Sequence, residues 1–134
     1  MTILTMAGML AAAGAGLLAA SMHAGAAGVV YASGGIGVEE RAVLESARSE
    51  FNLRMTFASK GSGEYRADVN VEIRAIQAPG NPVVLKADNT GPLFYASLPP
   101  GRYEVKAQSG GQQQARHVVL PQRGALQAYF YWSD

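Results

Sequence analysis

Histidine and cysteine, which often provide catalytic bases, nucleophiles and metal ligands, are scarce in this chain. Its 134 residues include no cysteine and only two histidines, His23 and His117. The absence of cysteine removes thiolate nucleophiles, disulfides and sulfur-ligated metal sites together. His23 falls within the predicted signal peptide described below. The remaining imidazole, that of His117, cannot alone build a site with several histidine ligands. Because Val118 and Leu120 set the inward phase of the surrounding strand, the sequence predicts that His117 faces solvent.

Paired carboxylates could act as the acid and base of glycoside hydrolysis. Here the acidic residues fall on an expected helix or alternate with cations along expected strands, which is typical of solvated faces with cross-strand ion pairs. These residues are Glu39, Glu40, Glu45 and Glu50 on the helix and Asp68, Glu72 and Glu104 on strands. We therefore predict that the protein is not an enzyme and has no catalytic residue, metal site or cofactor.

A glycine-rich segment, SGGIGVEE at residues 33–40, precedes the expected helix. Glycines at such a position can expose backbone amides to an anion. However, Glu39 and Glu40 already lie at the positive end of the helix, and no lysine or threonine follows as in a phosphate-binding loop. Two interpretations stay open, a tight turn into the helix or a partner-binding site. The candidate binding residues of this loop are Gly34, Gly35 and Gly37.

Two tyrosines near the end of the chain form a second candidate site. Tyr129 and Tyr131 fall on the outward face of the last expected strand. Exposed aromatic side chains can stack on sugars or anchor a protein interface. Alternatively, both rings could pack against the helix, which has to bury an apolar stripe.

Composition limits the classes of partner. The chain has 11 Lys and Arg against 10 Asp and Glu, so no basic excess favours binding to nucleic acid.

The amino-terminal stretch carries no charged side chain. The first charged side chain is Glu39, and the preceding stretch is rich in Ala, Leu and Gly. This stretch predicts a secretory signal peptide at residues 1–26, with Ala24-Gly25-Ala26 placing cleavage before Ala27. An uncleaved membrane anchor is the alternative, and after cleavage we expect no stable membrane insertion.

The remaining chain is expected to fold as one domain. Residues 27–50 are predicted to contain the glycine loop and a helix with Val43, Leu44, Ala47 and Phe51 on its apolar stripe. Residues 51–134 are predicted to form an antiparallel β-sandwich, because apolar and polar residues alternate in short runs separated by Gly and Pro turns. The seven expected strands lie at 51–58, 65–75, 83–87, 92–98, 102–108, 112–120 and 125–132.

The segment DNTGPLFYASLPPGRYEV, residues 88–105, resembles the signature of carboxypeptidase regulatory-like domains, which have a transthyretin-like (prealbumin-like) sandwich. The resemblance extends over about residues 65–132. Its matching positions are Asp88, Gly91, Leu93, Tyr95, Leu98, Pro99, Pro100, Gly101, Tyr103 and Val105. Together with YASGGIGVEER and FNLRMTFASKGSGEYRADV, this segment looks like small exported bacterial proteins that carry such a domain.

The resemblance implies a periplasmic or secreted module, and members of this family are generally accessory or interaction domains. We therefore expect a non-catalytic binding or structural module of the bacterial cell envelope, with a carbohydrate- or small-ligand-binding domain as the alternative. The expected partner is an envelope protein or a glycan, and a homodimer is also compatible with the sequence.

Overall fold

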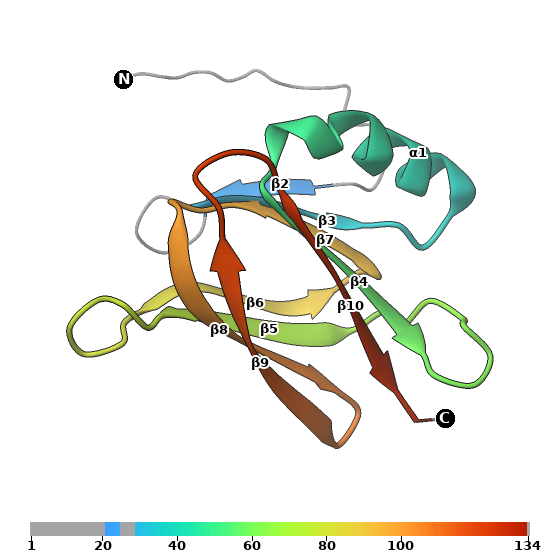
Figure 1. Cartoon of the computed structure of the whole chain (residues 1–134). Coiled ribbons are helices and arrows are strands. Elements are labelled where there is room, and N and C mark those ends of the chain that lie inside the picture. Colours follow the sequence, from blue (N-terminus) through green and yellow to red (C-terminus); the bar gives the residue numbers. More distant parts are fainter. Residues whose placement is uncertain (1–20, 25–28, 134) are drawn as a thin grey trace.

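The computed structural model describes residues 21–24 and 29–133, and there two β-sheets pack face to face with one helix outside them (Figure 1). One sheet has the strand order β10-β4-β7-β3-β2, and the other has the order β6-β5-β8-β9. The elements are β2 (Ser21–Ala24), β3 (Val30–Gly34), α1 (Val38–Ala47), a 3-10 turn (Arg48–Glu50), β4 (Leu53–Ser59), β5 (Val69–Ala75), β6 (Val83–Thr90), β7 (Leu93–Ser97), β8 (Gly101–Ser109), β9 (Gln112–Leu120) and β10 (Leu126–Trp132). The prediction of a mainly β sandwich, with one helix and seven strands after it, is confirmed.

The predicted signal peptide at residues 1–26 lies mostly outside the described residues, as does the proposed cleavage point. Its segment Ser21–Ala24 forms β2, which pairs antiparallel with β3 at the edge of the five-stranded sheet. No helix within residues 21–24 and 29–133 is long and apolar enough to cross a bilayer.

Side chains that alternate along the strands fill the space between the two sheets. Leu53, Met55 and Phe57 of β4 and Tyr103 and Val105 of β8 are buried there, as the two-residue period predicts. Phe57, Phe94, Phe130 and Trp132 of the first sheet are among its largest fully buried side chains. Burial of these apolar side chains is the main force that holds the sheets together.

The start of β5 differs from the prediction. The strand predicted at 65–75 would place Tyr65 on the inward face together with Val69 and Val71, but Tyr65 is 49% exposed and the strand begins only at Val69. The reason is Asp68, whose φ of 58° places it in the left-handed region and interrupts the extended chain.

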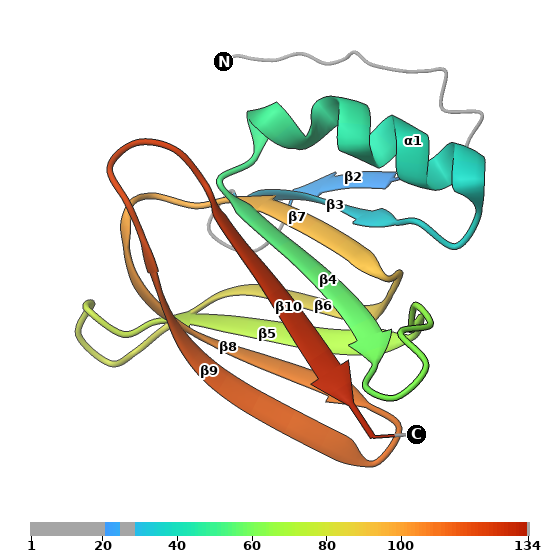
Figure 2. The ribbon, with the colours of Figure 1, turned by 45° about the vertical axis from the view of Figure 1, so that its right-hand side comes forward.

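Helix α1 lies on the outer face of the five-stranded sheet, over β3 and β7 (Figure 2). Leu44 and Phe51 are buried there in a second apolar cluster with Leu93 and Tyr95. The predicted stripe is wrong at Val43, which is 38% exposed. Both faces of β7 are therefore covered, which explains why its burial does not alternate.

The side chains of β7 also point to the opposite faces from those predicted. The spacing along the strand predicted at 92–98 indicates Leu93, Tyr95 and Leu98 as its inward residues, but Leu93 and Tyr95 pack beneath the helix. Phe94 and Ala96 occupy the sandwich core instead, while Leu98 is buried in that core as predicted.

One strand pair among the described residues runs parallel, whereas the sequence predicts an antiparallel sandwich with no helix between its strands. Strand β10 pairs parallel with β4, with Tyr129 opposite Thr56 and Tyr131 opposite Ala58. No crossover helix is needed, because the chain passes through the whole second sheet before it returns beside β4.

The turn between β7 and β8 is fixed by side-chain hydrogen bonds. The Asn52 amide donates to the Leu98 carbonyl (2.7 Å), and its Oδ1 accepts from the Leu98 N–H (3.0 Å). The Tyr103 hydroxyl donates to the Pro99 carbonyl at 2.6 Å. The Leu-Pro-Pro-Gly sequence is thus tied to Asn52, which directly precedes β4, and to Tyr103 of β8.

The sequence DNTG at residues 88–91 is typical of a turn in which the Asp88 side chain bonds its own backbone, but this prediction is wrong. Asp88 lies within β6, and the local irregularity falls on Asn89, whose φ is 56°. The Asn89 N–H donates to Oδ1 of Asn70 on the adjacent strand at 2.9 Å.

The open edge of β10 is covered by side chains from β9. The Gln114 amide donates to the Tyr131 carbonyl at 2.5 Å, and the Arg116 guanidinium donates to the Tyr129 carbonyl at 3.1 Å. Unpaired strand edges are sites where another strand can add, so these bonds protect this side of the sandwich.

Candidate functional site

The structure separates the two candidate sites that the sequence indicates. The glycine loop lies at the start of α1, against β3 and the turn between β6 and β7. Tyr129 and Tyr131 lie on the outer face of β10, at the opposite edge of the same sheet from β2. Tyr129 borders a different cavity from the one at the glycine loop. The two sites are therefore spatially separate.

The amides of the glycine loop already have an acceptor within the chain. The Glu40 side chain is 8% exposed and reaches back from the first turn of α1. Its Oε1 accepts the N–H groups of Gly35 and of Ile36, the latter at 3.0 Å. The neighbouring Arg41 guanidinium donates to the carbonyls of the same two residues at 3.0 and 3.2 Å. An external anion would have to displace Glu40 to reach these amides.

Close packing accounts for two of the glycines around this loop. A Cβ on Gly34 would lie 2.7 Å from Oε1 of Glu40, and a Cβ on Gly91 would lie 2.5 Å from the Gly34 carbonyl oxygen. Gly34 belongs to β3, whereas Gly37 precedes the helix and has open space around it. The geometry thus gives the loop a clear structural role in joining β3 to α1.

Tyr129 and Tyr131, which we call the tyrosine surface, present their rings to solvent. Their exposed fractions are 46% and 49%, and their ring centroids lie 6.3 Å apart with planes inclined by only 10°. The Gln127 amide donates to the Tyr129 hydroxyl at 2.8 Å, which orients that ring. Helix α1 packs its buried side chains on β3 and β7, so it leaves the tyrosine surface uncovered.

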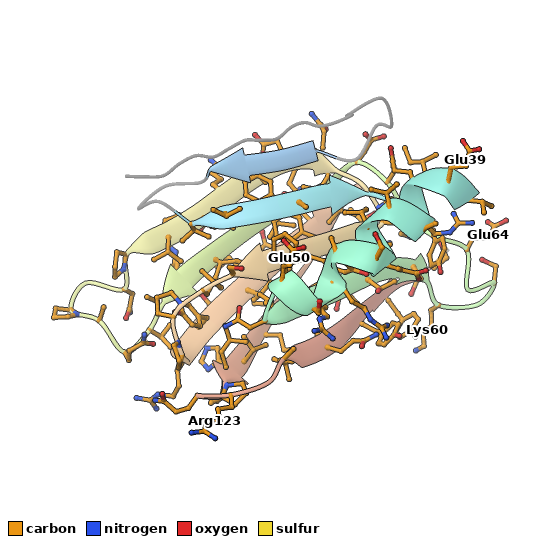
Figure 3. All side chains as sticks on the ribbon, turned by 90° about the horizontal axis from the view of Figure 1, so that it is seen from above. Glu39, Glu50, Lys60, Glu64 and Arg123 are labelled. Carbon is orange, nitrogen blue, oxygen red and sulfur yellow. The ribbon has the colours of Figure 1, made fainter. Side chains whose placement is uncertain are left out.

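A small cavity of about 80 Å³ separates the end of α1 from β10. We call it the arginine cavity, because Arg48 and Arg54 both line it. Its lining residues are Glu45, Arg48, Arg54, Thr56, Tyr65, Leu93, Tyr95, Gln127 and Tyr129. Figure 3 shows α1 lying across the sheet from Glu39, near its start, to Glu50, just beyond its end, which is the end that borders the cavity.

The two arginines of the cavity are held differently. Arg54 uses its Nε to donate to the carbonyls of Arg48 and Phe51, at 2.9 and 3.2 Å, and so fixes the chain after the helix. The Arg48 side chain is exposed and has no hydrogen-bond or ion-pair partner among the described residues. Neither arginine forms an ion pair within residues 21–24 and 29–133.

Tyr95 forms part of the cavity wall beneath the helix. Burial raises the pKa of its hydroxyl above the usual value for tyrosine, and the nearby Glu45 carboxylate adds to the effect, while Arg48 and Arg54 oppose it. The hydroxyl therefore remains protonated at neutral pH and is available as a hydrogen-bond donor.

Two further polar features of the described residues lie on the second sheet, away from the two candidate sites. His117 is exposed, as predicted, and its Nε2 lies 3.7 Å from Oε2 of Glu104. Within the described ranges, no three His, Asp or Glu side chains come close enough together to hold a metal ion. The outer face of the second sheet carries a polar depression of about 250 Å³ between Lys86 and Lys106.

Sequence reasoning identified Tyr129 and Tyr131 but not the cavity beside them. The missing residues, chiefly Arg48, Arg54 and Gln127, come from separate segments of the chain. Arg54 and Gln127 become neighbours only through the parallel pairing of β4 and β10. The one local signal was the outward phase of Arg54 in its alternating strand.

Comparison of the chain with models of known protein families and with curated protein sequences finds no match.

Proposed function

We propose that this chain is a non-catalytic binding module exported to the bacterial cell envelope, and that it contacts its partner through the tyrosine surface. The observation that carries the proposal is the pair of nearly parallel, half-exposed rings of Tyr129 and Tyr131 beside a polar cavity. Tyrosine provides a large contact area with little loss of conformational entropy, and it is enriched where proteins bind partners.

Export is supported by the amino-terminal sequence. Its uncharged apolar stretch and the small residues Ala24-Gly25-Ala26 are typical of a cleaved signal peptide. The resemblance of residues 88–105 to carboxypeptidase regulatory-like domains also favours a transthyretin-like module in the periplasm or outside the cell.

A carbohydrate- or small-ligand-binding domain is the second candidate. The arginine cavity favours it, because Arg48, Gln127 and the hydroxyl of Tyr95 offer several hydrogen-bond donors next to an aromatic surface. Ligand sites in proteins commonly combine an apolar or aromatic wall with a few well-placed polar groups.

Binding to isolated cell envelopes tests the proposed contact surface. We expect the Tyr129→Ala/Tyr131→Ala double variant to lose about tenfold or more in affinity for envelopes, because exposed aromatic anchors contribute much of the binding free energy. The measurement is co-sedimentation of the purified protein over a range of envelope concentrations. Val119→Ala is the matched control, since Val119 is 62% exposed on β9 of the other sheet. Equal loss in both variants, or no loss in either, would contradict the proposal.

A further inference from the structure

The arginine cavity has a composition that suits one chemical group in particular. Arg48 and Arg54 bring two positive charges to a space of about 80 Å³, and Glu45 supplies one negative charge. The hydroxyls of Thr56 and Tyr95 add uncharged hydrogen-bonding groups. Guanidinium groups form strong charge-assisted hydrogen bonds with planar carboxylates. The net positive charge thus favours an anionic group, and the small volume favours a group of about the size of a carboxylate.

Arg48 is the arginine free to bind such a group. Arg54 uses its Nε for the carbonyls of Arg48 and Phe51, so it is fixed in place as part of the wall. Arg48 has an exposed side chain with no partner among the described residues. A ligand carboxylate placed between them would therefore meet one guanidinium that backbone carbonyls hold in place and one that has no partner among the described residues.

The tyrosine surface indicates which kind of molecule carries that carboxylate. Tyr129 borders the arginine cavity, whereas Tyr131, two residues further along β10, does not. The Tyr131 ring lies nearly parallel to that of Tyr129. The apolar face of a pyranose ring packs well on an aromatic surface, and its hydroxyls pair with amide groups such as that of Gln127. An acidic peptide would gain the charge contact but would make little use of two adjacent exposed rings.

We infer that the arginine cavity and the tyrosine surface together bind an acidic saccharide, with a sugar carboxylate between Arg48 and Arg54 and sugar rings over Tyr129 and Tyr131. This inference rests on the proposed function and names the partner class for the same surface. It also predicts that binding weakens as salt rises, because the ion pair lies at the edge of the cavity and is screened.

The test compares trigalacturonate with its fully methyl-esterified form by isothermal titration calorimetry on the purified exported protein. The ester keeps the rings and removes the charges. We expect the acid to bind about tenfold or more tightly than the ester, since each charge-assisted bond with Arg48 or Arg54 is lost in the ester. Hyaluronate oligosaccharide, a second carboxylated glycan, is expected to bind as well.

Variants separate the two parts of the site. Arg48→Gln is expected to weaken binding of the acid about tenfold while leaving the affinity for the ester unchanged. Tyr129→Ala is expected to weaken both ligands. Arg102→Gln is the control, because Arg102 is an exposed arginine on β8 of the other sheet. Circular dichroism of each variant checks that it is folded.

Several results would overturn the inference. These are equal affinities for acid and ester, no effect of Arg48→Gln, no binding of either acidic glycan, or a tetraglutamate peptide that binds as tightly as trigalacturonate. If the double tyrosine variant still loses its affinity for cell envelopes in such a case, the proposed binding function stands and only the partner class is wrong. If it keeps that affinity, the proposed surface is wrong as well.

Discussion

Phe57→Ala is expected to lower the free energy of unfolding by about 3–5 kcal/mol, because it leaves a cavity at the centre of the sandwich. The Phe57 side chain is fully buried and packs edge-on against two other rings. Its centroid lies 5.7 Å from that of Phe130 and 5.8 Å from that of Trp132. Because these partners come from β10, the variant tests the parallel pairing of the last strand with β4. The measurement is urea denaturation followed by tryptophan fluorescence, since Trp132 is the only tryptophan in the chain.

Tyr131→Ala is the control for this prediction. It also removes an aromatic ring, but from the exposed face of β10, so we expect a change within about 0.5 kcal/mol. A Phe57→Ala protein as stable as the wild type would mean that β10 does not complete the core. A strongly destabilised Tyr131→Ala protein would mean that this ring is buried.

Glu40→Ala is expected to lower the free energy of unfolding by about 2–4 kcal/mol, because it removes the acceptor for two backbone N–H groups at the glycine loop. Those donors cannot all reach water, since the Gly35 contact is buried. Thermal and urea denaturation give the size of the loss. Glu40→Gln keeps one side-chain oxygen in place and is expected to lose less.

Glu39→Ala provides a matched control in the adjacent position of the same helix turn. Glu39 is exposed and labelled at the start of α1 in Figure 3, so its loss should cost only the small interaction of a carboxylate with the helix dipole, about 0.3–1 kcal/mol. Equal effects at the two positions would contradict the capping role of Glu40. They would also reopen the glycine loop as a site for an external anion.

The sandwich could be predicted because its strands follow a simple pattern. In β5, Val69, Val71 and Ile73 are buried while the residues between them are not, and the same alternation holds in β8. A two-residue period can be recognised from neighbouring residues alone, without knowing which distant segments of the chain are in contact. It failed where both faces of a strand are covered, as at β7, since apolar residues on either face satisfy the same pattern.

The tyrosine surface could be predicted, but its surroundings could not. The outward phase of Tyr129 and Tyr131 follows from the alternation with Phe130 and Trp132. Whether the helix would cover them depended on where α1 packs, which is set by Leu44 meeting β7. The arginine cavity depends further on the parallel register of β10 with β4, a pairing between segments about 70 residues apart that local sequence patterns do not encode.

Glu40 illustrates a third kind of limit. A glutamate in the first turn of a helix is expected to interact with the helix dipole, and that much was predicted. Its carboxylate instead turns back to bind the loop amides of Gly35 and Ile36. This arrangement depends on the close approach of Gly34, Gly91 and the helix, which only the folded chain reveals.

The central claim, that the tyrosine surface is where the exported chain meets its partner, is tested most directly by site-specific photo-crosslinking in living cells. Benzoylphenylalanine replaces Tyr131 in one strain and Val119, on β9 of the other sheet, in a second strain. Mass spectrometry of the recovered chain then gives both its adducts and its first residue. The account predicts a protein or saccharide adduct at position 131, none at position 119, and a chain that begins at Ala27. An intact Met1 with no adduct at position 131, or an adduct at position 119 alone, would contradict it.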